Sequence, residues 1–451
     1  MKKIFNTISD IKRNPYLVFF LGFASIILIG TVLLALPVAS ISGKSAGFVD
    51  ALFTSASATC VTGLAVVSTA EYWTVFGKFV IILLIQIGGL GVMTMTAMIS
   101  FFFGKRISLK TRVLIMEERN VDELQGVVRL TKNILLFTFI SELVGAILLS
   151  IVFIDDYGIK KGIAFSLFHS ISAFCNAGFD LTGNSMMNYV DNPIITITIS
   201  FLVIIGGIGF YVFWEIISTK KIHMLSLHTK LVIIVTSILL VGGTLVIFLL
   251  EYNNPGTMGN LNLSGKIQAS IFHAVVPRTA GFNTLPLENF RISTAVIIMV
   301  LMFIGGSPAS TAGGIKTTTI GVLFISLFNL VRGKRDCEVF ERRILPEVTI
   351  KAAAILMIST TLIMLVTIIL SITEDHLGYD FLDILFETVS AFATVGLTRG
   401  ITPFLSDAGK IVLTFLMFIG RVGPITVAYA LLKEHKNIGN YTYPEGKIIV
   451  G

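Results

Sequence analysis

The chain has 451 residues, of which 54% are hydrophobic and 14% are charged, and its mean hydropathy is +0.87. A soluble domain carries about 25% charged residues, so this chain has too few polar side chains to cover a water-facing surface. The composition excludes a water-soluble globular protein and predicts an integral membrane protein. The net charge of +7 indicates membrane topology, and we expect no nucleic-acid partner because the sequence contains no nucleic-acid-binding motif.

Eight apolar segments are each long enough to cross a hydrocarbon core of about 30 Å at about 1.5 Å per residue. They come in four pairs, and the amphipathic stretch between the members of a pair, about 15 residues long, is too short to cross. Each stretch must enter the membrane and return on the same side, which predicts a re-entrant loop. The predicted first helices are 16–38, 133–154, 231–251 and 351–372, and the predicted second helices are 75–103, 193–217, 294–328 and 409–432.

Four copies of one unit explain this pairing. Each predicted loop has a Phe about ten residues before a Gly, and the aligned glycines Gly63, Gly178, Gly281 and Gly396 are 115, 103 and 115 residues apart. An Ile-Gly landmark follows each of them, at Ile87, Ile205, Ile304 and Ile419. The expected units are 1–104 (repeat 1), 105–220 (cytoplasmic linker and repeat 2), 221–330 (repeat 3, with a broken second helix) and 331–451 (cytoplasmic linker, repeat 4 and cytoplasmic tail).

The predicted fold is an all-α integral membrane protein with eight transmembrane helices and four re-entrant loops. Non-helical backbone at membrane depth is tolerated only where it is buried in protein or lines a water-filled path. The four glycine loops should therefore meet around one pore with pseudo-fourfold symmetry. Asp50 and Asp383 lie near the starts of the first and fourth loop segments, where a carboxylate favours a helix N-terminus and leaves the negative C-terminal end directed inward, toward a cation.

Basic residues gather on the N-terminus, on the linkers 105–132, 220–230 and 331–351, and on the C-terminal tail. The positive-inside rule places both termini and all linkers in the cytoplasm. We therefore expect a multi-pass protein of the cell membrane that contacts lipid. The opposite loops carry more acidic than basic residues, which would concentrate cations at an entrance.

The fourth loop contains Thr394-Val395-Gly396, the core of a potassium-channel filter, in which carbonyl oxygens replace the hydration shell of the ion. Glycine adopts backbone angles that let consecutive carbonyls point the same way. Four loops in matching register favour a filter over the alternative that glycine only eases helix packing. The candidate ion-binding residues are Val61, Thr62 and Gly63, then Asn176, Ala177 and Gly178, then Thr279, Ala280 and Gly281, and finally Thr394, Val395 and Gly396.

The third unit interrupts its second apolar helix with a run of Gly, Pro, Ser and Thr that will not continue as regular helix. This run is not a phosphate-binding loop, because Ile315 separates Gly314 from Lys316. We interpret it as a flexible gate below the filter, with a simple helix kink as the alternative. The candidate gate residues are Gly305, Gly306, Ser307, Pro308, Ala309, Ser310, Thr311, Ala312, Gly313, Gly314, Lys316 and Arg421.

Arg421 is included because its aligned partners in the other units are glycines: Gly89, Gly207 and Gly306. A charge at membrane depth is costly and is typical of a functional site. We interpret Arg421 as an electrostatic barrier or gate element in the pathway. The alternative is a structural pair with a carboxylate.

The chain resembles the Trk/Ktr/HKT superfamily of potassium transporters, and among these it is most similar to bacterial Ktr membrane subunits. The resemblance covers nearly the whole chain and rests on the four filter glycines, on GGSPASTAGGIKTTT at 305–319 and on IGRVGP at 419–424. It implies potassium uptake across the cell membrane, a homodimer with one pore per subunit, and a regulatory ring of cytoplasmic nucleotide-binding RCK subunits. In plant relatives a serine at the position of Gly63 is associated with sodium transport, so Gly63 implies a preference for potassium.

Potassium is expected as the transported ion at the filter residues, with sodium as a second candidate ion and no organic cofactor in this chain. Cys60, Cys175 and Cys337 are expected to be free thiols. The alternative function is a sodium- or proton-coupled potassium symporter that uses Glu142 or Glu215. An intramembrane enzyme and a membrane sensor are the other classes, and we expect no enzyme because no paired acids, His cluster or Ser/Lys dyad recurs at membrane depth.

Overall fold

The computed structural model describes residues 15–91, 94, 127–219, 221–334 and 336–431, and this part of the chain is almost entirely helical. The strands in it form one antiparallel hairpin, β1 (Cys337–Val339) and β2 (Arg342–Ile344), in which Cys337 pairs with Ile344. The N-terminal basic residues, most of the linker 105–132 and the C-terminal tail lie outside the described residues. The predictions that concern them stay predictions.

Four long apolar helices correspond to the predicted first helices, and by length and composition each could cross a membrane. They are α2 (Pro15–Ala35), α8 (Val127–Phe174), α11 (Leu227–Glu251) and α15 (Pro346–Thr373). Helix α8 is longer than predicted because it runs on into the following short helix through Gly158, where φ is +75° and the axis kinks. Glycine accepts this left-handed backbone, so the chain can turn there.

A short buried helix precedes each aligned glycine. These are α3 (Phe48–Thr59), the part of α8 after Gly158, α12 (Leu263–Val275) and α16 (Phe381–Ala393). The aligned phenylalanines Phe53, Phe168, Phe272 and Phe386 are each at most 5% exposed. The hydrophobic residue shared by the four segments therefore anchors each short helix in the core.

The second helices are not continuous, and the prediction of unbroken helices over 193–217 and 409–432 is wrong. Helices α9 (Pro193–Ile208) and α10 (Phe210–Ser218) meet at an angle of 94°, as do α17 (Asp407–Val422) and α18 (Pro424–Leu431). The breaks lie at Gly209 and Gly423, whose φ angles are +101° and +94°. A glycine in this conformation ends a helix.

The same register ends the second helix in the other two units. Helix α5 (Val75–Leu90) ends at Gly91, where φ is +84°, and the rest of the helix predicted to residue 103 lies, apart from residue 94, outside the described residues. In the third unit the predicted break is confirmed, because α13 (Ile292–Phe303) and α14 (Thr317–Val331) are separated by residues 304–316. All four breaks fall within a few residues of the Ile-Gly landmark.

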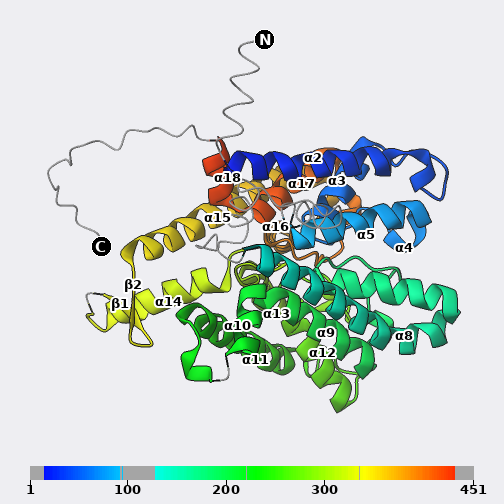
Figure 1. Cartoon of the computed structure of the whole chain (residues 1–451). Helices are drawn as coiled ribbons and strands as arrows, with labels where there is room; N and C mark the ends of the chain where they lie inside the picture. The colour runs from blue at the N-terminus through cyan, green and yellow to red at the C-terminus, as the bar shows by residue number, and fades with distance from the viewer. Residues whose placement is uncertain (1–14, 92–93, 95–126, 220, 335, 432–451) are drawn as a thin grey trace, which may run out of the picture.

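The units pack in a closed order. Helix α5 contacts α8, α9 contacts α12, α13 contacts α16, and α17 contacts α3, so the last unit returns to the first. In Figure 1, α2, α3, α5 and α17 lie along the top of the molecule, and α8, α9, α11 and α12 lie along the bottom. The remaining short helices are η1 (Pro37–Ala39), α4 (Thr69–Tyr72), η2 (Met187–Tyr189), η3 (Ile222–Met224), η4 (Leu287–Asn289), η5 (Asp375–Leu377) and η6 (Thr402–Phe404).

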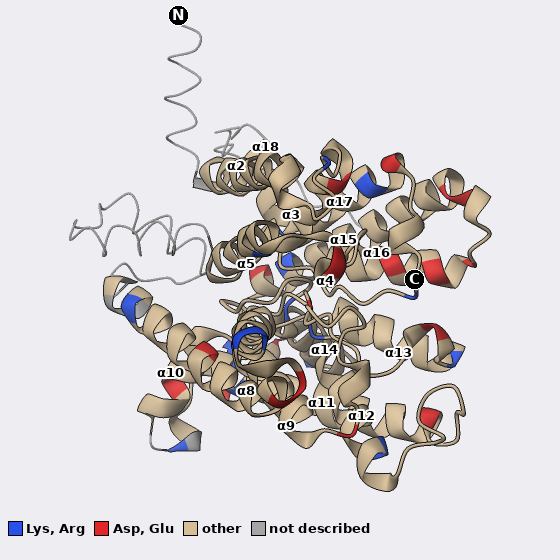
Figure 2. Cartoon of the chain, turned by 90° about the vertical axis from the view of Figure 1, so that its right-hand side faces the viewer, with Lys and Arg blue, Asp and Glu red and all other residues tan. Residues whose placement is uncertain are grey.

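The outer surface of the bundle is apolar. Large side chains such as Val32, Val241 and Ile372 are each more than 60% exposed along the long helices. Figure 2, which views the right-hand end of Figure 1, shows mostly uncharged ribbon with charged positions in short patches. Exposed apolar area of this extent is typical of a surface that faces lipid. The structure supports a multi-pass membrane protein.

The helix breaks predict a site-specific effect of adding one methyl group. A Cβ at Gly209 would lie 2.5 Å from the Pro308 carbonyl oxygen on a backbone with φ of +101°, so Gly209→Ala should destabilise the protein by about 1–3 kcal/mol. Gly242 in α11 is the matched control, because nothing lies within 4 Å of its Cβ position and its φ is ordinary. Thermal melting in detergent should show a lower midpoint for Gly209→Ala only, and equal midpoints would contradict this account of the bend.

Candidate ion pathway

The four predicted filter loops share one backbone conformation. Each aligned glycine has a positive φ, and so does the residue two positions before it. Non-glycine residues rarely adopt this conformation, so four of them in one register indicate a common requirement. The φ angles are +58° at Val61, +61° at Asn176, +71° at Thr279 and +53° at Thr394, and +93°, +67°, +72° and +92° at Gly63, Gly178, Gly281 and Gly396.

Alternation between left-handed and ordinary backbone turns successive main-chain groups to the same side of the chain. In each loop the residue between the two left-handed positions is not itself left-handed. Each loop can therefore present consecutive carbonyl groups along one side, which is the chemistry needed to replace water around a cation.

The four glycines approach one another directly. A Cβ built on Gly178 would lie 2.7 Å from the Gly281 Cα, one on Gly281 would lie 3.4 Å from the Gly396 Cα, and one on Gly396 would lie 3.0 Å from the Gly63 Cα. A Cβ on Gly63 would lie 3.1 Å from the Gly178 Cα, which closes the ring. The carbonyl oxygens beside these positions come from the neighbouring loop in each case: Ala177, Ala280, Val395 and Thr62.

Serines on the short helices hold three of the loops. Gly63 N donates to Ser57 Oγ and Gly396 N donates to Ser390 Oγ, both at 3.1 Å, and Ser172 Oγ donates to the Phe179 carbonyl at 2.8 Å. All three serines lie six residues before the glycine, whereas the shorter third loop has Val275 there. These serines were not among the predicted site residues, although their shared spacing is visible in the sequence.

The side chain of Asn176 lies between loops. Its Nδ2 donates to the Arg278 carbonyl at 3.1 Å and to Thr279 Oγ1 at 3.4 Å. Arg278 is 2% exposed, and its Nη2 donates to Thr236 Oγ1 of α11 at 3.4 Å. The amide nitrogen of Asn176 thus connects the second and third loops.

The candidate gate segment, residues 305–314, forms a closed loop that packs on α9. Its ends are joined because Ile304 and Ile315 form a parallel β-bridge. Ser307 N donates to the Gly207 carbonyl at 2.9 Å, and Thr311 N donates to the Gly206 carbonyl at 3.2 Å. Because α9 ends at the break, the carbonyls of Gly206 and Gly207 have no donor within the helix. The gate segment supplies a donor to each of them.

The same segment lies against the filter loops. Thr311 Oγ1 donates to the Phe174 carbonyl at 3.2 Å, and a Cβ on Gly313 would lie 3.1 Å from Thr394 Cβ. A Cβ on Gly314 would lie 3.3 Å from the Ala393 carbonyl oxygen. Two glycines of the segment therefore allow it to approach the fourth loop closely. The other candidate gate residues make main-chain contacts. The Gly306 carbonyl accepts from Thr317 N, and the Ala309 carbonyl accepts from Phe210 N. Ser310 Oγ donates to the Ser307 carbonyl, a Cβ on Gly305 would clash with the Gly313 carbonyl, and Pro308 is only partly buried.

Two basic side chains hold the gate segment. Arg421 Nη1 donates to the Thr311 carbonyl and Nη2 donates to the Gly88 carbonyl at the end of α5. Lys316 Nζ donates to the Ala312 carbonyl within the segment at 2.7 Å. Arg421 thus joins the fourth unit to the gate segment of the third unit and to the second helix of the first.

The acids proposed for ion coupling have different surroundings. Glu142 is 3% exposed, and Gln86 Nε2 donates to its Oε1 at 3.0 Å. Glu215 instead accepts from Ser226 N and Ser226 Oγ at 2.7 Å and from Thr229 Oγ1, at the start of α11. Glu215 therefore caps a helix, whereas Glu142 is a buried acid beside a neutral amide.

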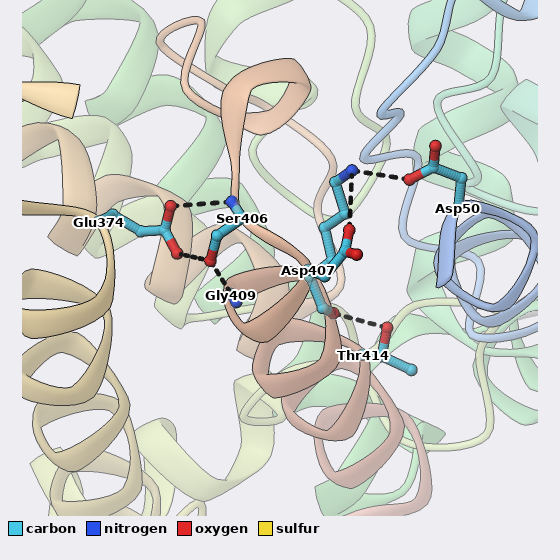
Figure 3. Close-up of polar contacts among 7 residues, drawn as sticks. Asp50, Glu374, Ser406, Asp407, Gly409 and Thr414 are labelled. Atoms are coloured by element: carbon cyan, nitrogen blue, oxygen red, sulfur yellow. Dashed lines mark hydrogen bonds and ion pairs between the residues drawn. The ribbon is translucent and has the colours of Figure 1, made fainter. Parts of the chain in front are cut away.

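The two acids that were expected to favour a cation at the loops lie in the first turns of short helices, as predicted. Each forms an ion pair with a basic side chain. Asp50 and Asp383 occupy the first turns of α3 and α16. Lys410 Nζ lies 2.7 Å from Asp50 Oδ1 and 3.7 Å from Asp407, and Arg399 Nε lies 2.6 Å from Asp383 Oδ1. Figure 3 shows Asp50 approaching the start of α17 from one side and Glu374, which binds Ser406, from the other.

The serine bonds predict a measurable contribution to stability. Ser57→Ala and Ser390→Ala should each cost about 0.5–1.5 kcal/mol, because each removes the acceptor for a buried glycine N–H. Ser25→Ala is the control, since its exposed hydroxyl binds only the carbonyl of Leu21 in its own helix. A thermal midpoint that falls as much for Ser25→Ala as for the other two variants would refute the role assigned to these serines.

Comparison with known proteins identifies the family of the chain. The family description "TrkH: Cation transport protein" matches residues 15–440. The chain is 46% identical over 441 residues to Ktr system potassium uptake protein B of Bacillus subtilis, which spans 98% of both chains. It is 41% identical to potassium/sodium uptake protein NtpJ of Enterococcus hirae, over 98% of both chains, and 40% identical to Ktr system potassium uptake protein B of Vibrio alginolyticus, over 96% of this chain and 94% of the relative.

A solved structure has the same fold. The crystal structure of the potassium transporter TrkH from Vibrio parahaemolyticus superposes with a TM-score of 0.70 over 91% of this chain and 84% of the other, at 20% sequence identity. The resemblance predicted from the filter glycines and the gate segment is confirmed, and a cation-transport family confirms a transporter rather than an enzyme. The chain belongs to the TrkH family of cation transport proteins.

Proposed function

We propose that this chain is the ion-translocating subunit of a potassium uptake system. The observation that carries the proposal is the closed ring of four glycines, each in a loop with the same alternating backbone. Relatives at 40% and 46% identity are named potassium uptake proteins. Potassium sheds its water onto carbonyls of the residues predicted for the filter, which are 61–63, 176–178, 279–281 and 394–396.

The architecture that we propose has eight transmembrane helices and four re-entrant loops around one pore, in the four units predicted from the sequence. The closed order of helix contacts supports it, because the fourth unit packs on the first. The second helices count as spans even though they bend or break. Pseudo-fourfold symmetry then follows from four copies of one unit around the glycine ring.

The gate consists of residues 305–314, Lys316 and Arg421. In the structure the segment is held by carbonyl bonds to α9 and by the Arg421 guanidinium, and it lies against the second and fourth filter loops. Charged hydrogen bonds are stronger than neutral ones, so the hydrogen bonds of Arg421 contribute most to holding the segment in place. Withdrawal of the segment from the loops opens the path.

Coupling to sodium or protons is the second candidate function. Glu142 supports it, because a buried carboxylate bonded to a neutral amide can hold a proton or a small cation. The relative from Enterococcus hirae is named for both potassium and sodium. Glu215 is an unsuitable coupling site because it caps a helix.

The partners that we propose are a second copy of the chain, membrane lipid and a separate cytoplasmic ring of nucleotide-binding RCK subunits. No organic cofactor is proposed for this chain. Both termini lie in the cytoplasm in this proposal, together with the β1–β2 hairpin and α18, which are found at the same end of the molecule in Figure 1. The regulatory ring would contact this end.

Ion flux into liposomes tests the filter. The purified chain, with its cytoplasmic partner if needed, should carry potassium in preference to sodium, and Gly63→Ser should reduce that preference by about tenfold or more, because the added side chain cannot fit the ring and displaces a carbonyl. Gly242→Ala serves as the control. Potassium preference unchanged in Gly63→Ser would contradict the assigned filter, and absence of flux with partner and coupling ions supplied would contradict transport.

Two variants test the gate. Arg421→Ala removes two charged hydrogen bonds, each contributing on the order of 1.5–3 kcal/mol, so potassium flux should rise by at least about tenfold with selectivity retained. Deletion of residues 307–312 should give constitutive leak. Arg332→Ala, an exposed arginine at the end of α14, should leave flux unchanged. Wild-type flux in both test variants would remove the gate from the proposal.

A further inference from the structure

The residue that follows the aligned phenylalanine makes a similar contact in three of the four units, although its chemical type differs between units. The residue after the aligned phenylalanine is Thr54, His169, His273 or Glu387 in the four units. In three of them its side chain binds the chain that leaves the filter: Leu181 N donates to His169 Nε2 at 3.2 Å, His273 Nε2 lies 3.3 Å from Thr284 Oγ1, and Thr402 Oγ1 donates to Glu387 Oε1 at 2.5 Å. These side chains clamp the short helix to the segment after each loop.

The fourth clamp differs because it is a carboxyl group. Glu387 is 1% exposed, and its Oε2 has no hydrogen-bond partner in the described chain. The one acid among the three clamping side chains thus has one oxygen bonded and one oxygen unsatisfied. A buried carboxylate of this kind is costly unless a proton or a cation completes it.

A hydrogen-bond chain leads from this acid to the partly exposed residue Thr398, which follows the fourth loop. Thr402 is fully buried and lies 3.0 Å from Thr398 Oγ1, which in turn accepts from Gly400 N at 3.1 Å. Thr398 is partly exposed and is two residues after the filter glycine Gly396. The hydroxyls of Thr402 and Thr398 therefore link Glu387 to the solvent side of the fourth loop.

The chain has two complete arrangements, since each hydroxyl carries one proton to donate. With a proton on Glu387, the acid donates to Thr402 and Thr402 donates to Thr398. With the acid ionised, Thr398 donates to Thr402 and Thr402 donates to Glu387. The proton enters from the external solution through Thr398 and returns to it, so protons balance and no other reactant is required.

The neighbouring charges are engaged elsewhere. Helices α13, α15 and α17 pack against α16. Charged groups in or at the ends of these helices have other partners: Asp383 pairs with Arg399, Lys410 with Asp50 and Asp407, Glu374 with Ser406, and Arg421 with the Thr311 and Gly88 carbonyls. Arg291 at the start of α13 is exposed. No ion pair with Glu387 occurs among the described residues.

We infer that Glu387, Thr402 and Thr398 form an external proton-binding site that adjusts the fourth filter loop. The inference rests on the proposed potassium filter. Glu387 is a positioning residue, because it acts on the ion through the loop and through its charge. Ionisation places a negative charge behind the loop and stabilises a cation in the filter, so alkaline external solution should strengthen potassium binding.

The test is potassium flux into liposomes at external pH from about 5 to about 9 with the internal pH held constant. The apparent KM for potassium should fall about four- to seventeenfold as external pH rises, the change expected for a unit charge roughly 10 Å from the ion at an effective dielectric constant of about 20–40. Glu387→Gln keeps the shape of the clamp and should make KM independent of external pH. Thr402→Val, which interrupts the hydroxyl chain, should also weaken the dependence, and Glu387→Asp should restore part of it.

The control is Glu288→Gln, which neutralises an exposed acid whose main-chain carbonyl alone is bonded, and it should retain the wild-type dependence. A wild-type KM that does not change with external pH would overturn the inference, as would a dependence that persists unchanged in Glu387→Gln. Failure of the wild type to carry potassium at any pH would instead contradict the proposed function and this inference with it.

Discussion

The close approach of four main-chain segments at the glycine ring constrains the rest of the structure. With the Cα atoms of neighbouring loops this close, no side chain fits, and each loop must adopt left-handed backbone at two positions. Such backbone costs free energy at Val61, Asn176, Thr279 and Thr394. The surrounding structure offsets that cost with short buried helices, three serine bonds and the clamps at the following segments, so the loops depend on everything packed behind them.

The breaks in the second helices are related to the same glycine ring. The chain bends by 94° at Gly209 and at Gly423 instead of continuing as a straight helix. The helix ends that result expose carbonyl groups, and the gate segment and Arg421 donate to those of Gly206, Gly207 and Gly88. The same main-chain groups that a helix leaves unsatisfied at its end thus become the attachment points for the candidate gate segment.

The sequence alone predicted the parts of the fold that recur. Four glycines in register, four long apolar helices and the interruption of the third unit are visible because each is a repeated or compositional signal. The bend at Gly209 was missed because the flanking residues are apolar on both sides, so hydropathy does not change where the helix ends, whereas the Gly423-Pro424 dipeptide is a break signal that was visible in the sequence. A single glycine within an apolar helix is an ambiguous signal. The partners of Arg421 and Glu387 lie about 110 and 15 residues away in sequence, and only the packed structure brings those groups together.

The gate segment occurs in one unit of four, although the ring that it lies against is nearly symmetric. A tetramer of identical chains would repeat any such segment four times, and its opening would require four movements. In this chain a single segment, residues 305–314, is joined to the other units by Arg421 and by the end of α9 at its bend. In the proposed gating mechanism, opening would involve the movement of this one loop, and the other three units would keep the glycine ring unchanged while it occurs.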